Sequence, residues 1–144
     1  MRVQSSIVVN APADLVRDVY ADYASWAEIF PTISAVRVKE HRGSTLVLEV
    51  DHVEGKVTNE LTPTSDGELV LGEVKRRYDA VFVNQFDPIT AGTRFTVCGE
   101  LHFKGAARLL EPVLGWYVRR QMRHLQLEPV KARAEAKAAR AGGR

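Results

Sequence analysis

The sequence predicts an α+β domain in which a curved antiparallel sheet of about seven strands wraps around one long C-terminal helix. Two observations predict this class. Between residues 36 and 103, turn signals recur about every 8–12 residues between short segments rich in alternating apolar residues, as in an antiparallel meander. From residue 106 onward, apolar residues recur at helical spacing.

The first thirty residues predict a strand and two short helices ahead of the meander. Ile7-Val8-Val9 is a short apolar run typical of a buried strand. Asn10-Ala11-Pro12 ends this run, and proline has the fixed φ of a first helical turn. Apolar residues then recur at helical spacing as far as Tyr23. Trp26–Phe30 forms a second short helical turn that Pro31 closes.

The remaining strands are expected between Gly-, Asn-, Asp- and Pro-containing turns, with Asp87 to Gly92 forming the last loop. Alternation assigns one face of each strand to the core; in the last strand that face holds Phe95, Val97 and Phe103. The expected segments are 36–40, 46–52, 57–62, 69–74, 78–86 and 93–103.

The C-terminal third is expected to be helical. Pro112 fits a first helical turn, and Pro129 removes a backbone hydrogen bond and should bend the helix. The whole chain is one expected domain, residues 1–140, and residues 141–144 are expected to form a disordered tail.

These features together resemble the START-like (SRPBCC) superfamily, which includes polyketide cyclase/dehydrase, coenzyme Q-binding and Bet v 1-like proteins. The resemblance covers nearly the whole chain. It implies the helix-grip fold and a ligand cavity between the sheet and the long helix, but it does not settle function, because one scaffold hosts many. The residues that carry it are Ile7 to Pro12, Val16, Val19-Tyr20, Asp22, Trp26, Phe30-Pro31 and Gly92-Thr93-Arg94.

Composition limits the class of protein and the cellular compartment that we expect. The 144 residues are 45% hydrophobic, enough for one ordinary core, and the single Cys98 leaves no internal disulfide. No apolar run approaches the roughly 18 residues of a membrane helix, and the N-terminus lacks the pattern of a signal peptide. We therefore expect a cytoplasmic protein without membrane insertion. Nucleotide-binding and zinc-protease motifs are absent and the histidines are scattered, so we expect neither cofactor nor metal.

The net charge of +2 is unevenly distributed along the chain. From Lys104 onward, the sequence contains ten Lys/Arg and three Asp/Glu. We interpret these cations as a solvated helix face, so nucleic acid is not an expected partner; a polyanion-binding face is the alternative.

Polar residues on the inner faces are the candidate functional groups. Asn59 and Asn84 stand on otherwise apolar strand faces, and each buried amide should have a partner in the protein, a water or a ligand. His52 and Tyr78 are the candidate proton-transfer residues. The residues expected to contact the ligand are Asn59, Asn84, Phe82, Phe86, Phe95, Val97, Leu114, Tyr117, Gln121, Trp26 and Phe30.

The predicted function is binding of a small hydrophobic molecule (polyketide-, lipid- or isoprenoid-like) in the cavity. The protein would act as a carrier or as a cyclase/dehydratase-like catalyst. We place binding first, because the sequence shows no pair of inward-facing acid and base side chains. The resemblance also leads us to expect an inward arginine in a cyclase, and strand 57–62 presents none. The alternative, from a different class, is a macromolecular interaction module that uses the basic helix. A homodimer is left open.

Overall fold

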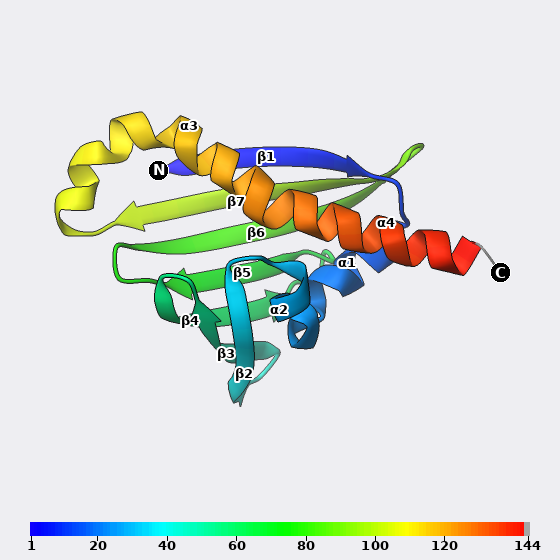
Figure 1. Cartoon of the computed structure of the whole chain (residues 1–144), viewed down its shortest axis with the longest axis horizontal. Coiled ribbons are helices and arrows are strands. Elements are labelled where there is room, and N and C mark those ends of the chain that lie inside the picture. Colours follow the sequence, from blue (N-terminus) through cyan, green and yellow to red (C-terminus); the bar gives the residue numbers. More distant parts are fainter. Residues whose placement is uncertain (143–144) are drawn as a thin grey trace.

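The structure, a computed structural model, describes residues 1–142. Its centre is one seven-stranded antiparallel sheet in the order β1-β7-β6-β5-β4-β3-β2. The sheet curves around the C-terminal helix, which crosses its concave face (Figure 1). The predicted α+β helix-grip fold is therefore confirmed. The strands are β1 (Arg2–Val9), β2 (Ile33–Arg42), β3 (Thr45–His52), β4 (Gly55–Pro63), β5 (Leu69–Val74), β6 (Tyr78–Ile89) and β7 (Gly92–Phe103).

Between β1 and β2 the chain forms three short helices, α1 (Ala13–Ala21), η1 (Tyr23–Ser25) and α2 (Trp26–Ile29). Pro12 precedes α1 with φ −61°, and its carbonyl accepts the first helical bond from Val16 N at 3.1 Å. These helices cover one end of the concave face (Figure 1).

The C-terminal helix is built from four consecutive segments. They are η2 (Gly105–Leu110), α3 (Glu111–Met122), a π-helical turn η3 (Arg123–Leu127) and α4 (Glu128–Gly142). The π-helical turn ends two residues before Pro129, where the sequence predicts an irregularity. Because α4 reaches Gly142, the first two residues of the predicted tail are helical; residues 143 and 144 lie outside the described residues.

An aromatic core fills the concave face at the end covered by α1 and α2. Tyr20 is its centre, with ring centroids 6.1 Å from Phe95 and 6.3 Å from Phe86. Trp26 Nε1 donates a hydrogen bond to the Tyr20 carbonyl at 2.9 Å, which satisfies the buried indole. This packing leaves the other end of the concave face, beneath η2 and α3, less completely filled.

The Gly92-Thr93 pair attaches β7 to the segment that follows β1. Gly92 has φ +130°, and a Cβ there would lie 2.3 Å from the Val9 carbonyl oxygen. The buried Thr93 Oγ1 donates to the Ala11 carbonyl at 2.7 Å. A side chain at residue 92 would therefore separate β7 from the end of β1.

Candidate ligand-binding site

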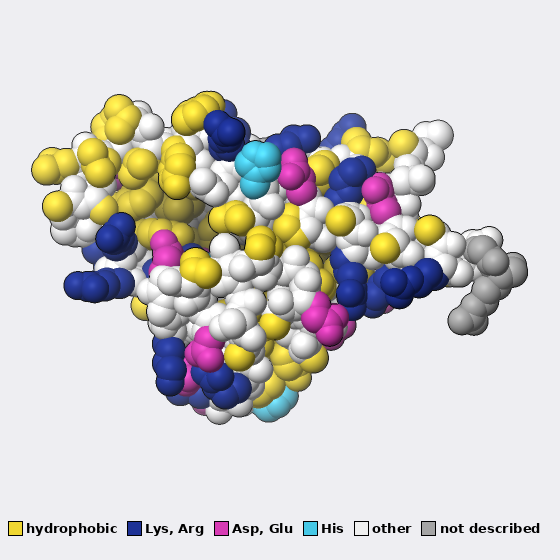
Figure 2. Space-filling model, viewed as in Figure 1, with side chains coloured by type: hydrophobic (Ala, Val, Ile, Leu, Met, Phe, Trp, Pro, Cys, Tyr) yellow, Lys and Arg dark blue, Asp and Glu magenta, His cyan; other side chains and the backbone are white. Residues whose placement is uncertain are grey.

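A cavity of about 450 Å³ lies between the inner face of the sheet and the C-terminal helix. Its walls are mostly apolar, with contributions from α1, α2, strands β2 to β7, η2, α3 and η3. Figure 2 shows the surface hollowed on this side, below the hydrophobic side chains of η2 and α3. The volume falls within the range of about 300–1,000 Å³ typical of small-molecule pockets.

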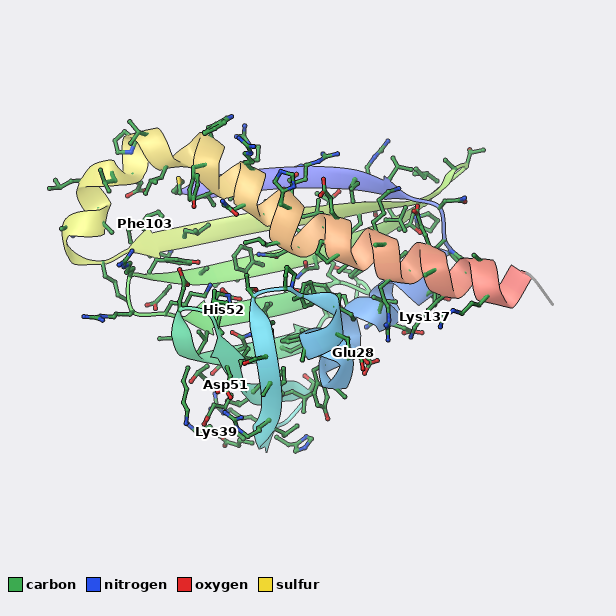
Figure 3. All side chains as sticks on the ribbon, in the orientation of Figure 1. Glu28, Lys39, Asp51, His52, Phe103 and Lys137 are labelled. Atoms are coloured by element: carbon green, nitrogen blue, oxygen red, sulfur yellow. The ribbon has the colours of Figure 1, made fainter. Side chains whose placement is uncertain are left out.

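The sequence predicted thirteen site residues, and the structure places nine of them at this cavity. His52 and Phe103 lie at strand ends on the side where the cavity opens, whereas Lys39 and Asp51 project away from it (Figure 3). The nine residues are His52, Tyr78, Asn59, Phe82, Leu114, Tyr117, Gln121, Trp26 and Phe30.

The other four predicted ligand contacts, Asn84, Phe86, Phe95 and Val97, lie outside the cavity lining. They occupy the correct inner face, but further along β6 and β7, where α1 covers the sheet. Phe86 stacks on Phe95 with centroids 5.2 Å apart. Asn84 is fully buried, and its Nδ2 donates to the Leu69 carbonyl at 3.0 Å. Alternation gives the face of a strand but not the position along it at which a helix covers that face.

Phe82 shapes the cavity wall opposite the helix. A Cβ on Gly99 would lie 3.0 Å from the Phe82 ring, so this ring occupies the space that a larger residue 99 would take. The space beside Gly99 is therefore filled by the neighbouring strand β6.

A polar cluster that the sequence analysis missed stands in the cavity. Glu73, near the end of β5, and Lys75, just beyond it, line the cavity with side chains only 13% and 10% exposed. Lys75 Nζ lies 3.4 Å from a Glu73 carboxylate oxygen and donates to the Tyr78 hydroxyl at 3.0 Å. Glu54 Oε2, at the rim, is also 3.4 Å from Lys75 Nζ. The Glu73 carboxylate, the Lys75 ammonium and the Tyr78 phenol are thus connected on one wall of the cavity.

Burial controls the ionisation of this cluster. Desolvation raises the pKa of Glu73, and the ammonium of Lys75 offsets only part of that rise. Desolvation also opposes the charge on Lys75, but Glu73, Tyr78 and Glu54 outweigh it and raise the Lys75 pKa. Burial likewise raises the pKa of Tyr78, partly offset by Lys75. Glu73 therefore takes up a proton more readily than an exposed carboxylate would.

His52 stands at the cavity rim with its imidazole neutral near pH 7. Burial, together with the nearby Lys75 charge, lowers its pKa. Its Nδ1 accepts a hydrogen bond from the Glu54 backbone N–H at 3.2 Å, which assigns the ring proton to Nε2. In this arrangement His52 offers the cavity a hydrogen-bond donor rather than a free base.

Asn59 offers a second polar contact. Its side chain is buried at 3% exposure and its Oδ1 has no hydrogen-bond partner among the described residues. Asn59 is paired directly with Glu73 across β4 and β5, so both side chains stand on the inner face. An unpartnered buried amide oxygen costs about 1–3 kcal/mol, and a donor on a ligand or a water removes that cost.

Glu73 had a sequence signal. Leu69, Leu71 and Glu73 alternate along β5, so the two buried leucines assign the carboxylate to the inner face, and Lys75 continues the series. The cavity arginine was also missed: Arg77, in the turn between β5 and β6, lines the opening. Arg37, by contrast, is bound on the outer face by Asp51 and Glu49.

Among residues 1–142, no group of three or more His, Cys, Asp or Glu side chains is arranged to hold a metal ion. In the same stretch, no helix combines the length and apolarity needed to cross a membrane.

Fold and site together define a helix-grip protein with an internal, largely apolar ligand cavity. The sequence matches the family model described as polyketide cyclase / dehydrase and lipid transport over residues 1–135, so the chain belongs to that family. No curated protein matches the sequence.

Several solved structures share the fold. The Zhui aromatase/cyclase from Streptomyces sp. R1128 has a TM-score of 0.76 at 17% identity, covering 94% of this chain and 93% of its own. TTHA0849 from Thermus thermophilus has a TM-score of 0.78 at 14% identity, covering 96% and 99%. Ara h 8.0201 has a TM-score of 0.73 at 13% identity, covering 94% and 98%. At such identities the likeness concerns the fold alone.

Proposed function

We propose that this protein binds a small hydrophobic molecule, polyketide-, lipid- or isoprenoid-like, with one oxygen-bearing polar end, in the cavity beneath α3. The observation that carries the proposal is the combination of an apolar wall with the polar cluster and the unpartnered Asn59 Oδ1. The apolar body of the ligand would contact Phe82, Leu101 and Leu114. Its polar end would meet Asn59 and the Lys75–Tyr78 pair.

Binding without chemistry remains the first form of this proposal, because an amide and a hydrogen-bonded phenol hold a carbonyl or hydroxyl without changing it. The Glu73 carboxylate supports the second form, a cyclase/dehydratase-like catalyst. In a cyclisation, Glu73 would accept a proton from the carbon beside a ligand carbonyl. The Tyr78 hydroxyl, held by Lys75, would donate a hydrogen bond to the developing oxyanion.

A neutral fluorescent probe, N-phenyl-1-naphthylamine, tests the binding form. Phe82→Ala widens the cavity and should change the probe's Kd, while Glu60→Ala, exposed on the other face of β4, should not. Leu61→Ala is the matched control for lost core packing, since Leu61 is 4% exposed but outside the lining. Equal Kd values in all three variants and wild type would overturn the proposal. If the probe does bind in the cavity, native mass spectrometry of protein purified from its own host would identify the natural ligand.

The catalytic form has a separate test once a ligand is known. Glu73→Gln and Tyr78→Phe should remove turnover while ligand affinity changes little, because both variants keep the size of the side chain. His52→Gln should have a smaller effect, since His52 only donates a hydrogen bond in this arrangement. Turnover that survives in both Glu73→Gln and Tyr78→Phe would assign the chemistry elsewhere.

A further inference from the structure

The most exposed cluster of large apolar side chains lies at the start of the C-terminal helix. Five residues of η2 and α3 form what we call the apolar tip. Trp116 is 67% exposed and Leu109 83%. Figure 2 shows this cluster as a protruding hydrophobic surface beside the opening of the cavity. The apolar tip comprises Leu109, Leu110, Val113, Trp116 and Tyr117.

Exposed arginines lie on two sides of the apolar tip; we call them the basic rim. Among residues 1–142, none of them is ion-paired with a carboxylate. Glu111 is the sole acidic residue between positions 104 and 127, and it is 3.1 Å from the Met1 amino group. Figure 2 shows Lys and Arg side chains on two sides of the hydrophobic surface. The basic rim comprises Arg76, Arg77, Arg108, Arg119 and Arg120.

The middle of the helix differs from its start, because its cations are ion-paired. Lys131 is ion-paired with Glu135 at 2.8 Å, and Arg133 with Glu28 at 3.1 Å. Arg123 lies 3.6 Å from a carboxylate oxygen of Glu128. Lys137 and Arg140, further along α4, form no ion pair among residues 1–142, but they lie away from the exposed apolar side chains. Beside those side chains, Arg108, Arg119 and Arg120 are the helix cations without an ion pair in the described part of the chain.

We propose that the apolar tip and the basic rim dock the protein on the surface of an anionic lipid bilayer. A bilayer supplies both requirements, acyl chains for Leu109 and Val113 and phosphate groups for the arginines. Trp116 and Tyr117 are the side-chain types that sit at the boundary between headgroups and acyl chains. Docking is peripheral and places the cavity opening, which Leu110 and Tyr117 also line, against the lipid.

Charge argues against a second copy of the chain as the occupant. A two-fold symmetric contact would bring the same surface from both copies together, so the two basic rims would face each other. The protruding shape of the tip also suits insertion between lipids (Figure 2).

Vesicle co-sedimentation tests the proposal with the full chain. Wild type should bind vesicles containing roughly one-third phosphatidylglycerol in phosphatidylcholine far more tightly than pure phosphatidylcholine, and salt should weaken the binding. Binding should also shift the fluorescence of Trp116 to shorter wavelength, whereas Trp26, at 2% exposure, should contribute no change. Trp116→Phe should abolish the shift and retain most of the binding.

Two paired variants separate the apolar from the electrostatic contribution. Leu109→Asp should weaken binding by at least about tenfold without affecting folding, whereas Val38→Asp, on the 39%-exposed Val38 of β2, should not weaken it. Replacing Arg108 and Arg119 by Ala should weaken binding to anionic vesicles about 30-fold, at about 1 kcal/mol for each cation. The matched double variant at Lys39 and Arg94 should bind as wild type.

Three results would overturn the proposal. The first is equal binding to both kinds of vesicle, or none to either. The second is a concentration-dependent dimer without lipid that Leu109→Asp dissociates, which would assign the tip to a second copy. The third is a micromolar, salt-sensitive complex with mixed-sequence RNA that needs Arg108 and Arg119 but not Leu109. None of these measurements depends on the cavity ligand, so they can fail without affecting the proposed function.

Discussion

Asn59 and Asn84 look equivalent in the sequence, each an amide on an apolar strand face, but their side chains bond differently. Asn84 donates to two backbone carbonyls, those of Leu69 at 3.0 Å and Phe82 at 3.4 Å. The amide oxygens of both residues lack a hydrogen-bond partner among residues 1–142, but Asn59 lines the cavity and Asn84 does not. One asparagine is therefore a structural residue and the other a candidate ligand contact.

Replacing each asparagine by leucine should separate these roles. Asn84→Leu should lower the free energy of unfolding by about 1–3 kcal/mol, because two buried carbonyls lose a donor. Asn59→Leu should leave stability unchanged or raise it, and should change which probes bind. Urea denaturation and probe titration of both variants provide the measurement. Similar destabilisation by the two replacements would contradict the assignment.

His52 should make stability depend on pH in a defined direction. The pKa of His52 is lowered in the folded protein. Its contribution to the free energy of unfolding is therefore complete above the pKa of the unfolded state, about 6.5, and is lost as pH falls through the pKa of the folded state. Stability of wild type should thus fall more steeply below about pH 6.5 than that of His52→Gln. Urea denaturation at several pH values measures this difference. His41→Gln, at an exposed position, is the control, and a curve for His52→Gln parallel to wild type would contradict the prediction.

At the scale of elements, the turn between β6 and β7 is shorter than its sequence predicts. The last strand was expected to begin at Thr93, and β7 begins one residue earlier, at Gly92. Pro88 led to the prediction of a loop from Asp87 to Gly92, but β6 continues to Ile89. The pairing of β6 with β5 ends at Asn84, so Pro88 pairs only with β7. Because no strand pairs with Pro88 on the β5 side, its missing N–H does not interrupt the sheet there.

Two glycine substitutions measure how closely this turn approaches β1. Gly92→Ala should destabilise the fold by at least about 2 kcal/mol more than Gly43→Ala. Both glycines have positive φ, but a Cβ at Gly43 meets nothing within 4 Å, whereas at Gly92 it would overlap the Val9 carbonyl. Thermal or urea unfolding measures the difference. Equal losses would show that β7 tolerates separation from β1.

At the scale of the whole molecule, the order of elements and their inner faces could be predicted, because apolar periodicity records which face is buried. The extent of the cavity could not. It depends on where α1 covers the sheet, which removes Phe86 and Phe95 from the lining, and on how far α3 extends over the open end. The inward position of Glu73 was predictable from the alternation along β5 alone. The contacts of Lys75 with Glu73 and Tyr78 depend on the turn between β5 and β6, which alternation does not describe.

The most direct test of the central claim locates a bound neutral probe by intermolecular nuclear Overhauser effects to methyl groups. N-phenyl-1-naphthylamine in the cavity should show contacts to the methyl groups of Val50, Leu71 and Leu101, which line it at 1%, 6% and 2% exposure. Leu109 and Val113, on the apolar tip, should show none. Contacts confined to Leu109 and Val113 would mean that the probe binds the outer surface, and would contradict the account of an internal ligand cavity.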